Sequence, residues 1–120
     1  MANILAVDDS TSLRQMVSYT LQGEGHTVVQ AQDGVDGLQA AKSQTFDLVI
    51  TDVNMPNMDG ISLIKELRSL PAYRNTPMLM LTTESGDEKK QEGKAAGATG
   101  WIVKPFNPDK LTSVIGRVLG

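Results

Sequence analysis

Five short apolar runs, each followed by a segment with helical character, place the strongest constraint on how this chain can fold. The runs are residues 4–7, 27–31, 48–50, 78–81 and 101–103. Apolar runs of this length that are bounded by Gly, Pro, Asn or Asp are typical of buried strands. Five strands alternating with five helices predict an α/β fold, a doubly wound parallel sheet with right-handed crossovers. We expect two helices on one face of the sheet and three on the other.

The helical segments differ in how clearly the sequence marks them. Asn107 is a favourable N-cap and Pro108 suits a first helical turn, so a helix is predicted from residue 108 to 119. Ser12 and Gln15 match a capping box, which predicts that the first helix begins near Ser12. Residues 84–100 are polar and contain four glycines, so the helix expected there has weak apolar support. That support comes from Ala95, Ala96 and Ala98.

Length, charge and composition exclude several classes of protein. A chain of 120 residues predicts one domain, residues 1–120, with no separate output domain. The net charge of -3 argues against nucleic-acid binding, and the absence of cysteine excludes disulfides. No apolar run approaches the roughly 18 residues of a membrane span, and the N-terminus lacks a secretory signal. We therefore expect a cytoplasmic monomer that binds neither nucleic acid nor membrane.

Polar residues stand at the ends of four of the five predicted strands. The first strand leads into Asp8 and Asp9, the third into Asp52, the fourth into Thr82 and the fifth into Lys104. The carboxyl ends of parallel strands meet at one edge of a sheet, so the three carboxylates should converge there. Carboxylates this close repel one another unless a cation intervenes. Mg²⁺ is favoured, because it accepts a few carboxylates, keeps several waters and bridges to phosphate.

Each of these residues, taken singly, has an ordinary structural interpretation. Adjacent acids such as Asp8 and Asp9 are common solvated caps, and a single lysine such as Lys104 is usually a surface residue. Thr82 alone is typical of the end of a strand. We interpret His26 as a loop histidine with no assigned role. The combination of three acids, a hydroxyl and a lysine at successive strand ends is what indicates a site.

Four short motifs carry a resemblance to a known family. They are Val7-Asp8-Asp9-Ser10, residues 52–60, Leu81-Thr82 and Val103-Lys104-Pro105-Phe106. In this order and spacing, the chain resembles the receiver domain of two-component response regulators over essentially its whole length. Within that family it is most similar to stand-alone chemotaxis regulators. The resemblance implies a flavodoxin-like sheet with the strand order 2-1-3-4-5.

The resemblance also implies roles for the acidic residues. Asp52 is expected to be the phosphoacceptor, which attacks a phosphohistidine of a sensor histidine kinase and forms an acyl phosphate. Asp9 and Asp52 are expected to bind Mg²⁺ together with the backbone carbonyl of Asn54. Asp8 is expected to bind the same ion through a water molecule.

Further implied roles concern the fourth and fifth strands. Lys104 is expected to pair with one phosphoryl oxygen and Thr82 to donate its hydroxyl to another, with a cis peptide bond between Lys104 and Pro105. Trp101 stands at the family's switch position, which usually carries Tyr or Phe. It is either a switch residue coupled to Thr82 or a partly buried anchor of the edge strand. Val53 stands where a chemotaxis regulator can carry Trp.

Three functions compete for this pattern. In the favoured hypothesis, phosphorylation of Asp52 switches the binding of another protein. A Mg²⁺-dependent aspartyl phosphatase would usually place a second acid two residues after its nucleophile, where this chain has Asn54. A nucleotide or flavin binder would need a glycine-rich phosphate loop after the first strand, where this chain has residues 8–12.

The expected partners follow from the favoured hypothesis and the resemblance. They are a sensor histidine kinase, a downstream protein and a phosphatase that acts on the phosphorylated form. The flagellar motor switch is the first choice for the downstream protein. A relay intermediate, or a stand-alone receiver of a pathway unrelated to motility, is the alternative.

Overall fold

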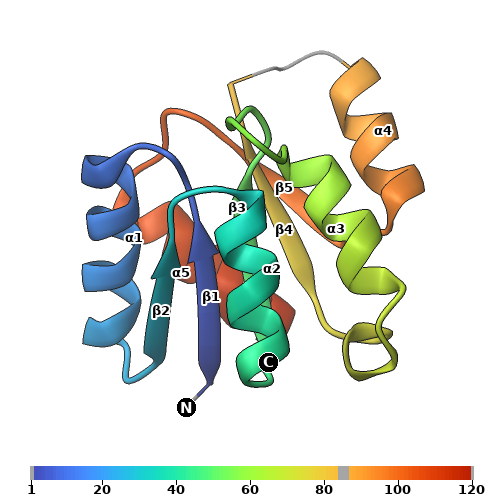
Figure 1. The fold of residues 1–120 in the computed structure, drawn as a ribbon. Coiled ribbons are helices and arrows are strands. Elements are labelled where there is room, and N and C mark those ends of the chain that lie inside the picture. The colour runs from blue at the N-terminus through green and yellow to red at the C-terminus, as the bar shows by residue number, and fades with distance from the viewer. Residues whose placement is uncertain (1, 84–86, 120) are drawn as a thin grey trace.

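The fold is built on a five-stranded parallel sheet with the order β2-β1-β3-β4-β5 (Figure 1). The computed structural model describes residues 2–83 and 87–119. The strands are β1 (Asn3–Val7), β2 (Thr27–Ala31), β3 (Leu48–Asp52), β4 (Met78–Thr82) and β5 (Gly100–Val103). The predicted fold class and strand order are therefore confirmed.

Helices cover both faces of this sheet, as Figure 1 shows. The helices α1 (Thr11–Gly23) and α5 (Pro108–Leu119) lie against each other on one face. The other face carries three helices, which are α2 (Gly34–Ser43), α3 (Gly60–Arg68) and α4 (Asp87–Ala96). A short 3₁₀ helix, η1 (Pro71–Tyr73), connects α3 to β4. The expected division into two helices and three is confirmed.

The apolar runs exist because the inner strands are buried on both sides. Every residue of β3 and of β4 is buried. Leu48 and Ile50 pack toward α1 and α5, whereas Val49 packs into the cluster formed with α2, α3 and α4. A strand with a packed layer on each side needs apolar residues at successive positions. This explains why polar and apolar residues do not alternate along β3 and β4. Asp52 is the charged residue that ends this buried strand.

The N-cap of the first helix differs from the one that the capping-box pattern predicts. Ser10, not Ser12, is the N-cap of α1, and its hydroxyl accepts a hydrogen bond of 3.3 Å from the backbone N–H of Leu13. Ser10 has the extended backbone that an N-cap requires, with φ -85° and ψ 113°. Ser12 lies within the first turn of the helix. The helix therefore begins near Ser12 as expected, but Ser10 and not Ser12 is its cap.

Two other helix starts can be compared with the sequence. Asn107 caps α5 as predicted, since its Oδ1 accepts the N–H of Lys110 at 2.8 Å. The Asp33-Gly34 pair directly follows β2, and its residue types are typical of a turn. In the structure Asp33 is the N-cap of α2, and Gly34 is its first helical residue.

The weakly marked helix α4 is present, with a different set of contacts. Ala96 is buried and Ala98 packs beside it, but Ala95 is exposed. Gly93 is buried against Met80, and a Cβ at position 93 would collide with the Met80 side chain. Close approach at a glycine therefore contributes to docking α4 on the sheet. None of the described helices is long and apolar enough to cross a membrane.

Candidate functional site

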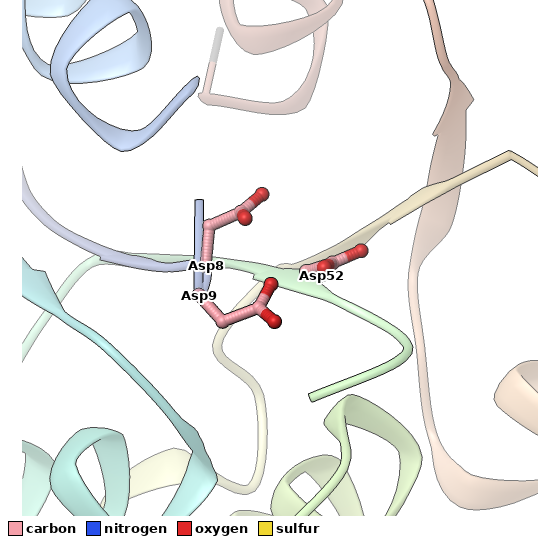
Figure 2. A group of neighbouring side chains, drawn as sticks. All are labelled: Asp8, Asp9 and Asp52. Atoms are coloured by element: carbon pink, nitrogen blue, oxygen red, sulfur yellow. The ribbon is translucent and has the colours of Figure 1, made fainter. Parts of the chain in front are cut away.

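Three carboxylates meet at the carboxyl edge of the sheet, as predicted. Asp8 and Asp9 follow β1, and Asp52 ends the neighbouring strand β3. The register pairs Val7 with Thr51, so the two strand ends lie at the same level. Each acid offers one oxygen, and these oxygens all lie within 4.8 Å of one another (Figure 2). We call Asp8, Asp9 and Asp52 the acid cluster.

The members of the acid cluster differ in their exposure to solvent. Asp8 is 2% exposed and Asp52 is 8% exposed, whereas Asp9 is exposed. Buried charges are costly unless they are paired and hydrogen-bonded. The Asp8 carboxylate accepts the N–H of Ser10 at 2.8 Å, and the Asp52 carboxylate accepts the N–H of Val53 at 2.9 Å. Backbone donors thus hold both buried acids, and the cluster opens to solvent at Asp9.

Lys104 supplies the positive charge of the site. Its Nζ donates to Asp52 Oδ1 at 3.0 Å and lies 3.4 Å from Asp8 Oδ2. The backbone N–H of Lys104 donates to the carbonyl of Thr82 at 2.7 Å, which fixes the end of β5 against β4. The peptide bond between Lys104 and Pro105 is cis, as expected. One ammonium group therefore lies between two carboxylates that come from different strands.

The surroundings of Asp52 raise its pKa. Burial is the largest cause, the hydrogen bond from Lys104 opposes it, and the negative charge of Asp8 adds to the increase. The lysine therefore compensates only part of the cost of a charged carboxylate here. Additional positive charge would stabilise the ionised form of Asp52.

The donor set of the acid cluster fits a hard divalent cation. It consists only of carboxylate oxygens, which are the ligands that Mg²⁺ and Ca²⁺ prefer. Asn54, whose backbone carbonyl is expected to complete the set, stands two residues after Asp52 at the exposed start of the β3–α3 loop. Its metal-binding role stays a prediction. His26 is bound elsewhere, since its Nδ1 accepts the N–H of Ala2 at 3.1 Å.

The backbone that follows Asp52 is closely packed against α3. The N–H of Gly60 donates to the carbonyl of Val53 at 2.8 Å. A Cβ at position 60 would collide with the backbone carbonyl oxygen of Asp52. Glycine at the first position of α3 therefore lets the helix approach the end of β3.

Sequence reasoning missed Arg14 as a support of the acid cluster. Arg14 lies in α1, and its Nη1 donates to the backbone carbonyl of Asp8 at 2.6 Å. Its Nε donates to the Gln30 side chain at 3.2 Å. A basic residue one to two helical turns after Asp8-Asp9 was the only signal in the sequence, and such residues are common on helix surfaces.

Thr82 and Trp101 lie on the neighbouring strands β4 and β5. Thr82 is 2% exposed at the end of β4. The strand register pairs Thr82 with Val103 and Met80 with Trp101, so the indole lies two residues short of the Thr82 level. Trp101 is 39% exposed, and Lys90 Nζ of α4 lies 5.2 Å from its ring centroid. Coupling between Thr82 and Trp101 stays a prediction.

Comparison with known proteins agrees with this geometry. Residues 4–116 match the family model for the response regulator receiver domain. The chain belongs to this family, and the resemblance carried by the four sequence motifs is confirmed.

Individual relatives indicate which kind of receiver domain this chain resembles. The chain is 57% identical to the chemotaxis response regulator CheY4 of Vibrio cholerae, with a TM-score of 0.96 and 99% of each chain covered. It is 38% identical over 119 residues to a chemotaxis protein CheY homolog of Campylobacter jejuni, covering 98% of this chain and 92% of that relative. A response regulator from Chloroflexus aurantiacus shares 34% identity, with a TM-score of 0.93 and coverage of 98% and 97%. This is a CheY-like receiver domain of two-component signalling.

Proposed function

We propose that the protein accepts a phosphoryl group on Asp52 from a phosphohistidine of a sensor histidine kinase, and that this switches its binding to a downstream protein. One observation carries the proposal. The Asp52 carboxylate is buried at the end of the central strand β3, within 4.8 Å of Asp8 and Asp9 oxygens and 3.0 Å from Lys104 Nζ. This arrangement provides a nucleophile together with a metal-binding donor set and a cation.

The transfer is a substitution at phosphorus. A carboxylate oxygen of Asp52 attacks the phosphorus, the new O–P bond forms and the P–N bond to the kinase histidine breaks. The electron pair of the P–N bond returns to the imidazole nitrogen, and Asp52 becomes an acyl phosphate. Attack of water on that acyl phosphate later releases inorganic phosphate and restores the carboxylate. Both steps are carried out at the protein's own site, with no turnover of a separate substrate.

Two side chains on the neighbouring strands act on the phosphoryl oxygens. Lys104 already contacts the Asp52 carboxylate, so its ammonium group is placed to pair with a phosphoryl oxygen once the acyl phosphate forms. The hydroxyl of Thr82, from the end of β4, donates to another oxygen. Thr82 precedes the β4–α4 connection. A contact between Thr82 and the phosphoryl group therefore carries the structural effect of phosphorylation toward α4 and β5.

Mg²⁺ is the proposed cofactor. Asp9 and Asp52 would hold it directly, with the backbone carbonyl of Asn54, and Asp8 would hold it through water. When bound, the ion supplies positive charge that offsets the charge on the transferring phosphoryl group. The need for such charge is supported by the site itself, since the acid cluster holds three carboxylates and the ammonium of Lys104 contacts two of them.

We infer the partners of this protein from the names of similar proteins. Proteins similar to this chain are named chemotaxis proteins, which favours the flagellar motor switch as the downstream partner. A relay intermediate or a receiver in another pathway is the alternative, and a phosphatase is a further partner. We also propose that residues 1–120 work as one cytoplasmic receiver domain. An aspartyl phosphatase is less favoured, because position 54 carries Asn where such enzymes place an acid.

Phosphorylation by a small donor tests the proposal. Acetyl phosphate with Mg²⁺ should add one phosphoryl group to the wild-type protein, measured by intact-protein mass spectrometry, and none to Asp52→Asn. Asp59→Asn is a matched control, because it makes the same change at an exposed helix N-cap that asparagine also supports. Full phosphorylation of Asp52→Asn would refute the assignment. Steady phosphate release without an adduct would instead support the phosphatase.

A further inference from the structure

The loop between β3 and α3 contains a strained turn. The backbone N–H of Met58 donates to the carbonyl of Pro56 at 2.7 Å, which closes a three-residue turn. Asn57, at its centre, has a φ of 68°. This is the rarer and more strained form of such a turn. A backbone conformation of this kind persists only where surrounding contacts hold it.

The contacts that hold the turn come from the start of α2. Asn57 Nδ2 donates to Asp33 Oδ2 at 2.7 Å, and the N–H of Gly34 donates to the carbonyl of Met58 at 3.1 Å. A Cβ at position 34 would collide with that same carbonyl oxygen. A glycine beside the Asp33 carboxylate therefore allows two hydrogen bonds to bind the turn to α2.

Asp33 is itself held in one orientation. It is 7% exposed, and its Oδ1 accepts the N–H of Asp36 at 2.8 Å as the N-cap of α2. The hydrogen bond from Asp36, and then the one from Asn57, lower the pKa of Asp33. An ionised carboxylate only accepts hydrogen bonds, so the amide nitrogen of Asn57 must face it. The orientation of the Asn57 side chain is therefore determined by Asp33.

The chain segment that leads from β2 into α2 also contacts Asp8, which follows β1. The backbone N–H of Asp8 donates to the carbonyl of Ala31 at 3.1 Å. Residues 31–34, which we call the brace segment, thus hydrogen-bond both to the first member of the acid cluster and to the loop after Asp52. The brace segment therefore links these two parts of the site through hydrogen bonds.

We propose that Asp33 and Asn57 are positioning residues of the metal and phosphoryl site. Their hydrogen bond holds the loop after Asp52 in its strained form, and so places the backbone carbonyl of Asn54 where it completes the Mg²⁺ ligands. This inference rests on the proposed function. Neither side chain belongs to the acid cluster, and both act through the backbone between Asn54 and Asn57.

A purely structural contact would behave differently. If the bond only stabilised the fold, breaking it would lower the unfolding temperature of metal-free protein and leave the Mg²⁺ affinity of the folded protein unchanged. If it positions the loop, Mg²⁺ affinity itself should fall in molecules that remain folded. Titration calorimetry with Mg²⁺ alone separates a structural role from a positioning role, because it measures the Mg²⁺ affinity of the folded protein. It requires no phosphoryl transfer.

Two variants break the bond from opposite sides. Asp33→Ser keeps a hydroxyl oxygen that caps α2 but is too short to offer a second acceptor to the amide of Asn57. Asn57→Gly removes the side chain and still permits a positive φ. Each should weaken Mg²⁺ binding about tenfold, the lower end of the effect of outer-shell partners on metal ligands. Because the two variants are independent, one that fails to fold leaves the other to decide.

The pair can also be exchanged. In the double variant Asp33→Asn with Asn57→Asp, the amide donates to the carboxylate in the reverse direction and the net charge is unchanged. We expect it to recover most of the wild-type affinity, whereas Asn57→Asp alone, with two carboxylates face to face, should not. Asp59→Asn again serves as the control, since it removes one negative charge at the N-cap of the adjacent helix α3.

The outcomes distinguish failure of the inference from failure of the proposed function. If wild-type protein binds Mg²⁺ in an Asp9-dependent manner but Asp33→Ser and Asn57→Gly bind it equally well, the positioning role is wrong. An equal loss in Asp59→Asn, or no recovery in the exchanged pair, would also overturn it. If wild-type protein shows no Asp9-dependent Mg²⁺ binding, the proposed function itself fails.

Discussion

Lys104 donates a hydrogen bond of 3.0 Å to Asp52 and lies 3.4 Å from Asp8, so one side chain connects the ends of β5, β3 and β1. In the sequence, Lys104 is 52 positions from Asp52 and 96 positions from Asp8. The lysine offsets part of the repulsion between two buried carboxylates, but burial and Asp8 still raise the pKa of Asp52. The metal-free site therefore retains an unfavourable electrostatic energy that a divalent cation should relieve.

Mg²⁺ should stabilise the folded protein through the acid cluster. At about ten times its Kd, the ion should add ~1.4 kcal/mol to the free energy of unfolding, because it binds only the folded state. This corresponds to a rise of about 4–8 °C in Tm. Asp9→Asn should reduce Mg²⁺ affinity by at least about tenfold, since direct ligands matter no less than outer-shell partners. Thermal unfolding across a Mg²⁺ series measures both effects, and equal responses of wild type and Asp9→Asn would contradict the site.

The pH dependence of metal-free stability should report the raised pKa of Asp52. Between the ordinary value of 3.8 and the raised value, the folded state binds more protons than the unfolded state, so stability contributed by this group falls as pH rises. Above the raised pKa the cost stays constant. Asp52→Asn removes it and should be more stable than wild type at neutral pH without metal.

That gain should shrink as the pH falls through the raised pKa toward 3.8, and it should vanish below 3.8, where Asp52 is protonated in both states. Denaturant unfolding of the two proteins across the pH range, with a chelator present, tests this. A gain that is independent of pH would show that the effect arises from packing and not from the charge of Asp52.

Gly60→Ala should disturb both the fold and the site. A Cβ at position 60 would collide with the backbone carbonyl oxygen of Asp52, so α3 or the end of β3 must move. We expect a loss of about 1–3 kcal/mol in unfolding free energy and slower phosphorylation by acetyl phosphate. Gly116→Ala is the control, because its added Cβ would meet no atom within 4 Å. In the interior of α5 it should be neutral or stabilising by about 0.5–1 kcal/mol.

Trp101 should report on the phosphorylated state. A phosphoryl mimic such as beryllofluoride, added with Mg²⁺, should draw the Thr82 hydroxyl toward Asp52 and open space near the indole. The ring should then leave its position beside Lys90, changing its fluorescence and its access to a quencher. Thr82→Ala should weaken that response while leaving Mg²⁺ binding intact.

A second variant separates movement of Trp101 from local charge effects. Lys90→Met removes the cation 5.2 Å from the ring centroid and should change the starting fluorescence without abolishing the response to the mimic. If wild type and Thr82→Ala respond identically, Trp101 is an anchor of the edge strand and the coupling runs elsewhere.

Local patterns in the sequence were sufficient to predict the elements and the convergence of the acids. Buried parallel strands require continuous apolar runs, and their carboxyl ends must lie on one edge. Asp8, Asp9 and Asp52 follow such runs, so their proximity could be predicted before any contact was known. Helix starts were less certain. Ser10 and Ser12 are chemically equivalent caps, and the choice between them depends on where the backbone turns out of β1.

The sequence by itself thus determined the class of fold, the edge on which the site lies and the residue types that compose it. Only the tertiary structure decided how these residues are held. The contact of Lys104 with Asp52 depends on how β5 lies beside β4 in the sheet. The bond between Asp33 and Asn57 joins two loops 24 residues apart. No periodicity encodes such contacts, because they depend on how separate elements pack and not on the propensity of either segment.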